Sequence, residues 1–186
     1  MAEPGRRRPA VFVDRDGTLM EDPGFVSDPA QVKLLPGAAP AVRRLNQAGL
    51  PVVLVTNQSG IARGLITIPQ YEAVEARLIK LLAGGGARLD GAYYCPHHPD
   101  FTGPCECRKP GTKLFRDAAA AQNLDLSRSF YVGDRMSDIE PARTLAGRGI
   151  LVRTGHGAEN AQAAIDAGFT VAGDLQTAVD LILEHP

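Results

Sequence analysis

Short apolar runs of strand length alternate along this chain with longer stretches whose apolar positions recur at helical spacing. The run at 51–55 is nearly all apolar, which is typical of a strand covered on both faces. Strands are expected at 11–13, 51–55, 92–94, 129–133, 150–152 and 170–172, and helices at about 37–48, 69–82, 112–122, 137–146, 159–167 and 175–183. This alternation predicts an α/β fold, a doubly wound and mostly parallel sheet with helices on both faces.

A single domain is expected over residues 1–186, because this length can bury one core and the sequence shows no internal repeat. The loop at 19–36, rich in Gly, Pro and Asp, should lie over the carboxyl end of the first strand. Residues 95–107 are expected to form a small insertion, and residues 1–9 a solvated tail. No large cap insertion is expected, so the site should be fairly open and the protein a monomer.

Charge and composition exclude several classes of partner. Twenty basic and 21 acidic residues give a net charge of −1. A nearly neutral chain without a wide basic face is not expected to bind nucleic acid non-specifically. No apolar stretch is long enough to span a membrane, and Met1–Pro9 leads into a strand rather than a secretory signal. The three cysteines lie within 13 residues of one another, which indicates a metal site in a reducing compartment. We therefore expect a cytoplasmic protein that acts on a small molecule.

Polar groups follow three of the expected strands at their carboxyl ends. Asp14 and Asp16 come directly after the first strand and, spaced two residues apart, should point the same way. The other members of this set are Thr56 and Asn57, Asp134 and Asp138, and the basic pair Arg108 and Lys109. Parallel strands bring their carboxyl ends to one edge of the sheet, where ligands bind. Acids and fixed positive charge at that edge suit a divalent cation and a phosphate.

This set of residues resembles the haloacid dehalogenase (HAD) superfamily of phosphotransferases. The resemblance rests on four motifs in order over 11–155, namely Asp14-x-Asp16-Gly17-Thr18, Thr56, Lys109 and Gly133-Asp134-x-x-x-Asp138. The longer words at 56–64 and 93–99 resemble the D-glycero-D-manno-heptose 1,7-bisphosphate 7-phosphatase family. Histidinol-phosphate phosphatase is among the nearest relatives of that family.

The resemblance and the chemistry of phosphate esters assign roles to the motif residues. Asp14 would be the nucleophile, and Asp16 the general acid and base. Thr56 and Lys109 would stabilise the phosphoryl oxygens, where charge collects in the transition state. Mg²⁺ would be held by Asp14, by the backbone carbonyl of Asp16 and by Asp134. Asp138 is expected to support the metal site or the start of its helix.

A second metal site is expected in the insertion. Three thiols and an imidazole, from Cys95, His97, Cys105 and Cys107, are the ligands of tetrahedral Zn²⁺. Four protein ligands leave no open position, so we interpret this zinc as structural. His98 is the alternative ligand, but the resemblance favours His97. Cys107 lies two residues before Lys109, so ordering of this loop should also position the basic pair.

Substrate contacts are implied by the resemblance outside the four motifs. They are Asp22, Pro23, Gly24, Phe25, Asn57, Gln58, Ser59, Arg108 and Arg135, with Arg63 a further basic candidate or a surface charge. The family often has Tyr in place of Phe25 and Lys in place of Arg135; the first change removes a hydroxyl donor and the second alters the donor geometry. His156 is interpreted as a loop residue.

The expected function is a Mg²⁺-dependent phosphoric monoester hydrolase that removes the 7-phosphate of a heptose 1,7-bisphosphate through an aspartyl-phosphate. Histidinol phosphate, or another small sugar phosphate, is the alternative substrate. A receiver-like signalling module also combines acids, Thr and Lys at strand ends, but its acidic pair and phosphoacceptor come from different strands, whereas Asp14 and Asp16 share one. A zinc-stabilised interaction module with an inactive site is a third hypothesis.

Overall fold

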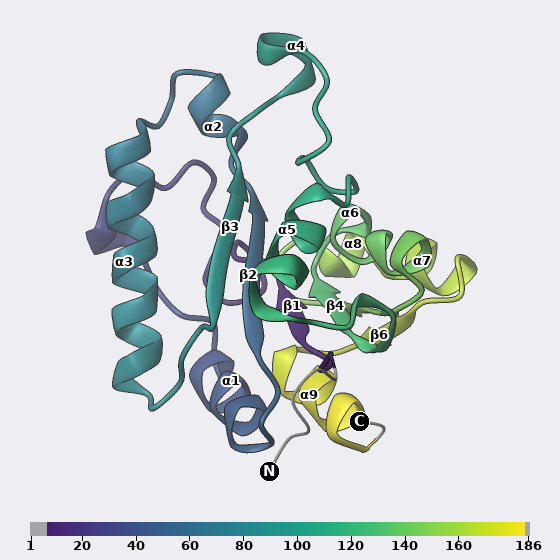
Figure 1. Cartoon of the computed structure of the whole chain (residues 1–186). Helices are drawn as coiled ribbons and strands as arrows, with labels where there is room; N and C mark the ends of the chain where they lie inside the picture. The colour runs from purple at the N-terminus through teal and green to yellow at the C-terminus, as the bar shows by residue number, and fades with distance from the viewer. Residues whose placement is uncertain (1–6, 185–186) are drawn as a thin grey trace.

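The computed structural model describes residues 7–184, and its centre is one six-stranded parallel sheet (Figure 1). The order of strands across the sheet is β3-β2-β1-β4-β5-β6. The strands are β1 (Val11–Val13), β2 (Val52–Asn57), β3 (Gly91–Cys95), β4 (Phe130–Gly133), β5 (Arg148–Val152) and β6 (Thr170–Ala172). Every neighbouring pair is parallel, with Val11 opposite Val52 on one side and Phe130 on the other. The predicted doubly wound α/β fold is confirmed.

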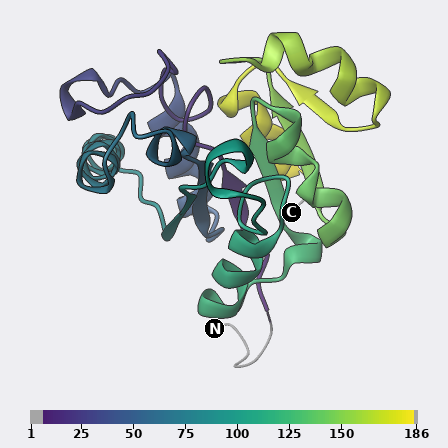
Figure 2. The same ribbon diagram turned by 90° about the horizontal axis from the view of Figure 1, so that it is seen from above.

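Helices cover both faces of this sheet; in Figure 1, α3 lies on one side of it and α5 on the other. The helices are α1 (Ala38–Gln47), α2 (Ser59–Ala62), α3 (Ile68–Gly84), α4 (Pro99–Thr102), α5 (Lys113–Gln122), α6 (Met136–Ile139), α7 (Pro141–Leu145), α8 (Gly157–Asp166) and α9 (Leu175–Glu184), with 3₁₀ turns at Pro29–Gln31 and Leu126–Arg128. Figure 2 shows the helices distributed around the sheet when it is seen from above. No helix within residues 7–184 is long and apolar enough to cross a membrane.

A hydrophobic core lies on each face of the sheet, and the three residues of β1 contribute to both. They do so because successive side chains of a strand point to opposite faces. Val11 and Val13 enter the cluster that includes the apolar faces of α1, α3 and α9. Phe12 enters the opposite cluster, where its ring lies 5.2 Å from those of Phe115 and Tyr131. The start of the sequence motif is therefore fixed by packing on both faces.

Two expected elements differ from the structure in ways the sequence explains. The helix expected at 137–146 is two short helices, α6 and α7, separated at Glu140. Pro141 begins α7 because it has no N–H to donate and can occupy only the first turn of a helix. Helix α3 begins one residue before the expected 69 and is closed there by a capping box between Thr67 and Gln70.

Part of the expected tail takes part in the fold. Residues 1–6 lie outside the described part of the chain, but Arg7 and Arg8 do not form a free tail. The Arg8 N–H donates to the carbonyl of Asn123 at 3.3 Å, and its carbonyl accepts from the N–H of Asp125 at 2.8 Å. The side chain of Arg128 donates to the carbonyl of Arg7. These backbone bonds correct the expectation for the last residues of 1–9.

Replacing Leu78 by Ala should lower the free energy of unfolding by about 2–5 kcal/mol, because this fully buried side chain of α3 would leave a cavity. The matched control is the next residue, Ile79, which is 41% exposed. Ile79→Ala should change stability by only about 0.5 kcal/mol. Urea unfolding at constant metal concentration measures both values, and equal losses would contradict this description of the core.

Candidate active site

Three neighbouring strands bring polar side chains to one edge of the sheet. Asp14 follows β1, Thr56 lies near the end of β2 and Asp134 follows β4, and all three side chains are buried. Asp14 and Thr56 border a cavity of about 550 Å³, and an oxygen of Asp134 lies within 4.8 Å of one from Asp14. The lining of the cavity consists of Asp14, Asp16, Asp22, Gly24, Phe25, Thr56, Asn57, Gln58, Ser59, Arg108, Arg135, Ser137, Asp138 and His156. The strand-end convergence expected from the sequence is therefore present.

Lys109 is the buried cation of this edge. Its Nζ donates to Asp14 Oδ1 at 2.7 Å and to the Val55 carbonyl at 2.7 Å, and it lies 2.8 Å from Asp138 Oδ1. Burial disfavours its charge, but Asp138 and Asp14 outweigh burial and raise the pKa of Lys109 above its usual value. The ammonium therefore stays charged beside the anionic edge.

Asn57 fixes the backbone from which this lysine extends. Its Nδ2 donates to the Lys109 carbonyl at 3.1 Å, and its Oδ1 accepts from the Lys109 N–H at 2.9 Å. This two-bond clamp uses most of the polar capacity of the Asn57 side chain. Asn57, expected to contact substrate, lines the cavity but mainly positions Lys109.

Asp14, Asp134 and Asp138 form a compact carboxylate cluster. One oxygen from each lies within 4.8 Å of the other two. Burial, followed by the charge of Asp14, raises the pKa of Asp134 to about 7. Burial also raises the pKa of Asp138 to about 6, although Lys109 acts in the opposite direction. Burial therefore disfavours the ionised form of these two acids, and a bound cation would stabilise that form.

One oxygen of this cluster directly indicates a ligand. Asp134 Oδ2 accepts from the His156 N–H at 2.7 Å, but Asp134 Oδ1 is buried with no hydrogen-bond partner. A buried carboxylate oxygen without a partner is costly unless an ion or water satisfies it. Hard oxygen donors from three acids fit a divalent cation such as Mg²⁺.

Two glycines leave room for Asp134. Gly17 and Gly155 have φ of +77° and +54°, and a Cβ on either would lie 2.3 Å from Asp134 Oδ2. Their turns are joined by a hydrogen bond from Thr154 Oγ1 to the Gly17 carbonyl at 2.6 Å. Side chains at these two positions would both strain the backbone and displace the carboxylate. The sequence motif indicated Gly17, but Gly155 was missed.

Asp16 lies outside the carboxylate cluster. Its two oxygens accept from Arg15 Nε at 3.0 Å and Arg15 Nη2 at 2.9 Å, and Gln58 Nε2 donates to it at 2.9 Å. Burial raises the pKa of Asp16, against the opposing charge of Arg15. The side chains that could hold a cation are thus Asp14, Asp134 and Asp138; Asp16 was expected to contribute its backbone carbonyl. Asp138 also caps α6 by accepting from the Arg135 N–H at 2.9 Å, as expected for a helix start.

The expected substrate residues divide into two groups. Asp22, Gly24, Phe25, Asn57, Gln58, Ser59, Arg108 and Arg135 line the cavity, whereas Pro23 and Arg63 are not among its lining residues. Arg63 Nη2 instead lies 2.9 Å from His98 Nε2, with its guanidinium 5.1 Å from the ring centre of Phe101. Gln58 is buried and both its amide hydrogens are used, on Asp16 and Thr56.

Sequence reasoning missed two residues that line the cavity, Ser137 and His156. The His156 imidazole Nε2 lies 3.5 Å from Asp22 Oδ2, and Arg135 Nη2 lies 3.6 Å from the same oxygen. His156 is in a loop, as interpreted, but this loop follows β5 at the ligand-binding edge. Its place between two glycines after an apolar strand was the available signal.

Cys95, His97, Cys105 and Cys107 converge at one point. Their three sulfurs lie 2.9–3.7 Å apart without a disulfide, and His97 Nδ1 is 3.2 Å from the Cys107 sulfur. Tetrahedral Zn²⁺ places sulfur ligands about 3.7 Å apart, so the set is compatible with zinc. His98 instead faces Arg63 and Asp100. The structure thus groups His97, and not His98, with the thiols.

Backbone carbonyls link this Cys/His cluster to the cavity. The Cys95 carbonyl accepts from the Gln58 N–H at 2.8 Å, and the Pro96 carbonyl accepts from the Ala62 N–H at 3.1 Å. The His97 carbonyl accepts from Arg108 Nη1 at 3.3 Å. The loop that carries the cluster therefore contacts both α2 and Arg108. This agrees with the expectation that the loop positions the basic pair.

Comparisons with known proteins agree with this geometry. The HAD-hydrolase-like family profile matches residues 106–178. D-glycero-D-manno-heptose-1,7-bisphosphate 7-phosphatase of Thermosynechococcus vestitus is 43% identical, and the alignment covers 96% of this chain and 97% of that protein. D-glycero-beta-D-manno-heptose-1,7-bisphosphate 7-phosphatase of Yersinia pestis is 42% identical over 79% of this chain and 81% of that protein.

A solved structure extends the similarity to three dimensions. D,D-heptose 1,7-bisphosphate phosphatase from B. bronchiseptica, complexed with magnesium and phosphate, superposes with a TM-score of 0.87 at 36% identity. The superposition covers 96% of this chain and 99% of that one. The similarity therefore extends over nearly the whole of both chains.

Without divalent cation, stability should fall as pH rises from about 4 to about 7. The pKa of Asp134 is about 7 and that of Asp138 about 6, against an ordinary 3.8, so the folded state holds protons that the unfolded state releases. A cation binds the ionised acids, so its stabilisation should grow over the same window. At about 100 times its dissociation constant it should reach about 2–3 kcal/mol.

Thermal unfolding with Mg²⁺ and with chelator, at about pH 5.5 and about pH 7.5, measures this linkage. Asp134→Asn is the control, because an amide does not titrate and should remove most of the gain from Mg²⁺. An equal Mg²⁺ gain at both pH values in the unaltered protein would contradict the assignment of the cation to this cluster.

Proposed function

Because the chain belongs to the HAD-like hydrolases, in the family of heptose 1,7-bisphosphate 7-phosphatases, we propose that it removes the 7-phosphate from D-glycero-D-manno-heptose 1,7-bisphosphate. The observation that carries this proposal is the buried contact of Lys109 with Asp14 and Asp138, two acids that line the cavity at the strand edge. A carboxylate, a fixed cation and a cation site at one point are what phosphoryl transfer requires. The identity of 42–43% to enzymes named for this substrate supports the choice of sugar.

In the first step, a carboxylate oxygen of Asp14 attacks the phosphorus. The bond from phosphorus to the sugar oxygen breaks, and Asp16 gives its proton to that oxygen, so the alcohol leaves and Asp14 carries an aspartyl-phosphate. Lys109 Nζ and the Thr56 hydroxyl stabilise the phosphoryl oxygens. Bound Mg²⁺ would neutralise the repulsion between Asp14 and the phosphate, and Asp14, Asp134 and Asp138 are the side chains placed to hold it.

In the second step, Asp16 accepts a proton from a water molecule that attacks the same phosphorus. The bond from phosphorus to Asp14 breaks, which releases inorganic phosphate and restores both carboxyl groups to their starting forms. One residue can serve in both steps because it gains in the second step the proton that it gave in the first. Asp16 lies at the cavity wall with its side chain 19% exposed, as this exchange with water requires.

The far end of the cavity would select the sugar. Arg108 and Arg135 supply positive charge for the second phosphate, and Asp22 supplies an acceptor for sugar hydroxyls. Asp22 Oδ2 lies 3.6 Å from Arg135 Nη2 and 3.5 Å from His156 Nε2. Gly24 and Phe25 on the same loop, with Ser59 at the start of α2, would complete the contacts. Pro23 and Arg63 are proposed only to support this loop and the Cys/His loop.

The three alternatives receive less support. Histidinol phosphate has no second phosphate to use Arg108 and Arg135, and the relatives at 42–43% identity are named for the heptose. A receiver-like module would take its acidic pair and phosphoacceptor from different strands, whereas Asp14 and Asp16 both follow β1. An inactive interaction module would have no use for the buried lysine and the carboxylate cluster.

The Cys/His cluster is proposed to hold a structural Zn²⁺ through Cys95, His97, Cys105 and Cys107. Burial disfavours ionisation of Cys105, but hydrogen bonds from its neighbours lower its pKa to about 7, which favours the thiolate that binds metal. Three thiols this close together without a disulfide are typical of a protein in a reducing compartment. We propose that this compartment is the cytoplasm. We also propose that the protein is a monomer.

Phosphate release from heptose 1,7-bisphosphate with Mg²⁺ tests the proposed activity. We expect turnover well above that of histidinol phosphate, and Asp14→Asn should lower it by about 10³-fold or more because the nucleophile is lost without a change in shape. Asp117→Asn is the control, since this exposed carboxylate pairs with Lys113 and is not among the residues that line the cavity. Preference for histidinol phosphate, or full activity in Asp14→Asn, would overturn the proposal.

Metal analysis of two neighbouring variants tests the zinc site. His98→Ala should keep about one zinc per chain, whereas His97→Ala should lose most of it, because only His97 faces the thiols. Loss of zinc should also disorder the loop whose His97 carbonyl accepts from Arg108. The His97→Ala protein should therefore bind substrate more weakly, because Arg108 is no longer held in place. Equal zinc content in the two variants would show that the ligand assignment is wrong.

A further inference from the structure

Arg15 is a buried charge to which the proposed reaction gives no role. It lies between the two motif acids, and it is among the largest side chains of the described residues with less than 2% exposure. A guanidinium remains charged at any ordinary pH, so its burial needs partners that justify the loss of hydration. Its partners therefore indicate its function.

Those partners belong to the general acid and its neighbour. Arg15 Nε and Nη2 donate to the two oxygens of Asp16 at 3.0 Å and 2.9 Å, and Nη2 also donates to Gln58 Oε1 at 3.0 Å. Gln58 Nε2 returns to Asp16 Oδ2 at 2.9 Å and reaches Thr56 Oγ1 at 2.9 Å. The network thus joins Asp16 to the hydroxyl proposed to hold the phosphoryl group.

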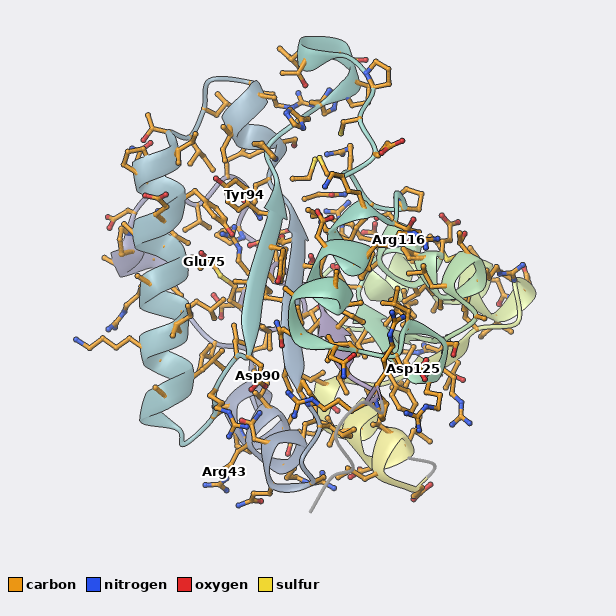
Figure 3. The ribbon with its side chains drawn as sticks, viewed as in Figure 1. Arg43, Glu75, Asp90, Tyr94, Arg116 and Asp125 are labelled. Atoms are coloured by element: carbon orange, nitrogen blue, oxygen red, sulfur yellow. The ribbon has the colours of Figure 1, made fainter. Side chains whose placement is uncertain are left out.

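The guanidinium is itself held on its flat side. Arg15 Cζ lies 5.5 Å from the centre of the Tyr71 ring. Tyr71 is fixed by its hydroxyl, which donates to Glu75 at 2.7 Å, and by its ring, which lies 4.2 Å from that of Tyr94. Figure 3 labels Glu75 on α3 and Tyr94 on β3. Helix and sheet together therefore fix the guanidinium plane.

A paired contact of this kind determines orientation as well as position. A fork that binds both carboxylate oxygens fixes the rotation of the carboxyl group, which a single contact leaves free. Lysine can supply the charge but not the planar fork. The side chain of Asp16 remains 19% exposed toward the cavity, so it is held at the wall and still accessible to substrate.

We propose that Arg15 is a positioning residue that aims the Asp16 carboxyl group at the oxygen of the leaving alcohol. This inference rests on the proposed function, in which Asp16 is the acid and base. An acid that is misaimed protonates its target more slowly, and general acid–base catalysis contributes about 10²–10⁴-fold. Arg15 thereby acts on the leaving group and on the attacking water, and not on the attack by Asp14.

This division predicts a dependence on the leaving group. A sugar alkoxide needs a proton to leave, whereas p-nitrophenolate leaves as a stable anion. In Arg15→Lys, turnover of the heptose bisphosphate should fall about 10²-fold. The rate of the first release of p-nitrophenol from p-nitrophenyl phosphate should stay within about threefold of the unaltered protein, and a burst should appear because the second step still needs Asp16.

The comparison is a ratio of two rates in one sample, so loss of folded protein cancels. Asp16→Asn provides the reference pattern of a missing acid, and Arg88→Met is the matched control, because it removes an exposed guanidinium that pairs with Asp90. Should Arg15→Lys not fold, Tyr71→Leu is compared with Tyr71→Phe, since only the first removes the ring beneath the guanidinium. The same pattern is expected there, with a smaller loss.

Equal losses with both substrates, or no loss with the sugar phosphate, would overturn the role of Arg15. Failure of the proposed function would look different, because the unaltered protein would then release little phosphate from the heptose bisphosphate, or Asp14→Asn would remain active. A leaving-group pattern in Asp16→Asn that is absent in Arg15→Lys would leave the proposed function intact and remove this inference alone.

Discussion

The buried ammonium of Lys109 is the contact on which the site depends. It contacts Asp14, the candidate nucleophile after β1, and Asp138, which caps α6. It also donates to the Val55 carbonyl of β2. A buried pair of charges contributes little net stability, but loss of one partner leaves the other stranded at high cost. The site is therefore held in one arrangement even though its charges do not stabilise the fold.

The surroundings of Lys109 show how such a charge is kept in place. Asn57 clamps its backbone, and the Cys/His cluster immediately before it fixes Arg108 and α2 through three carbonyls. When all three carboxyl groups of the cluster are ionised, they carry more negative charge than the Lys109 ammonium balances, and the unpartnered oxygen of Asp134 marks where a further cation fits. The insertion thus serves the chemistry by ordering the chain that carries its cations.

Local sequence determined the elements and most of the site. The alternation in Val11, Phe12 and Val13 directs side chains into both cores, and this follows from strand geometry alone. Residues placed directly after parallel strands must meet at one edge, so the order of strands and polar residues along the chain is enough to predict that Asp14, Thr56 and Asp134 converge. The spacing of the three thiols and the imidazole in the insertion was likewise enough to predict that these four side chains converge.

What the sequence could not determine were contacts between side chains from distant elements. Gln58 and Asn57 stood among the substrate residues, but packing turns their amides onto Arg15, Asp16 and Lys109. His156 and Gly155 reach Asp134 because β5 pairs with β4, so the loop after β5 lies beside the end of β4; the His156 N–H then donates to Asp134, a contact that the spacing of residues did not specify. Secondary structure and strand-end chemistry are properties of short stretches and can be read from the sequence. Hydrogen-bond partners depend on where every neighbouring element packs, so only the tertiary structure decides them.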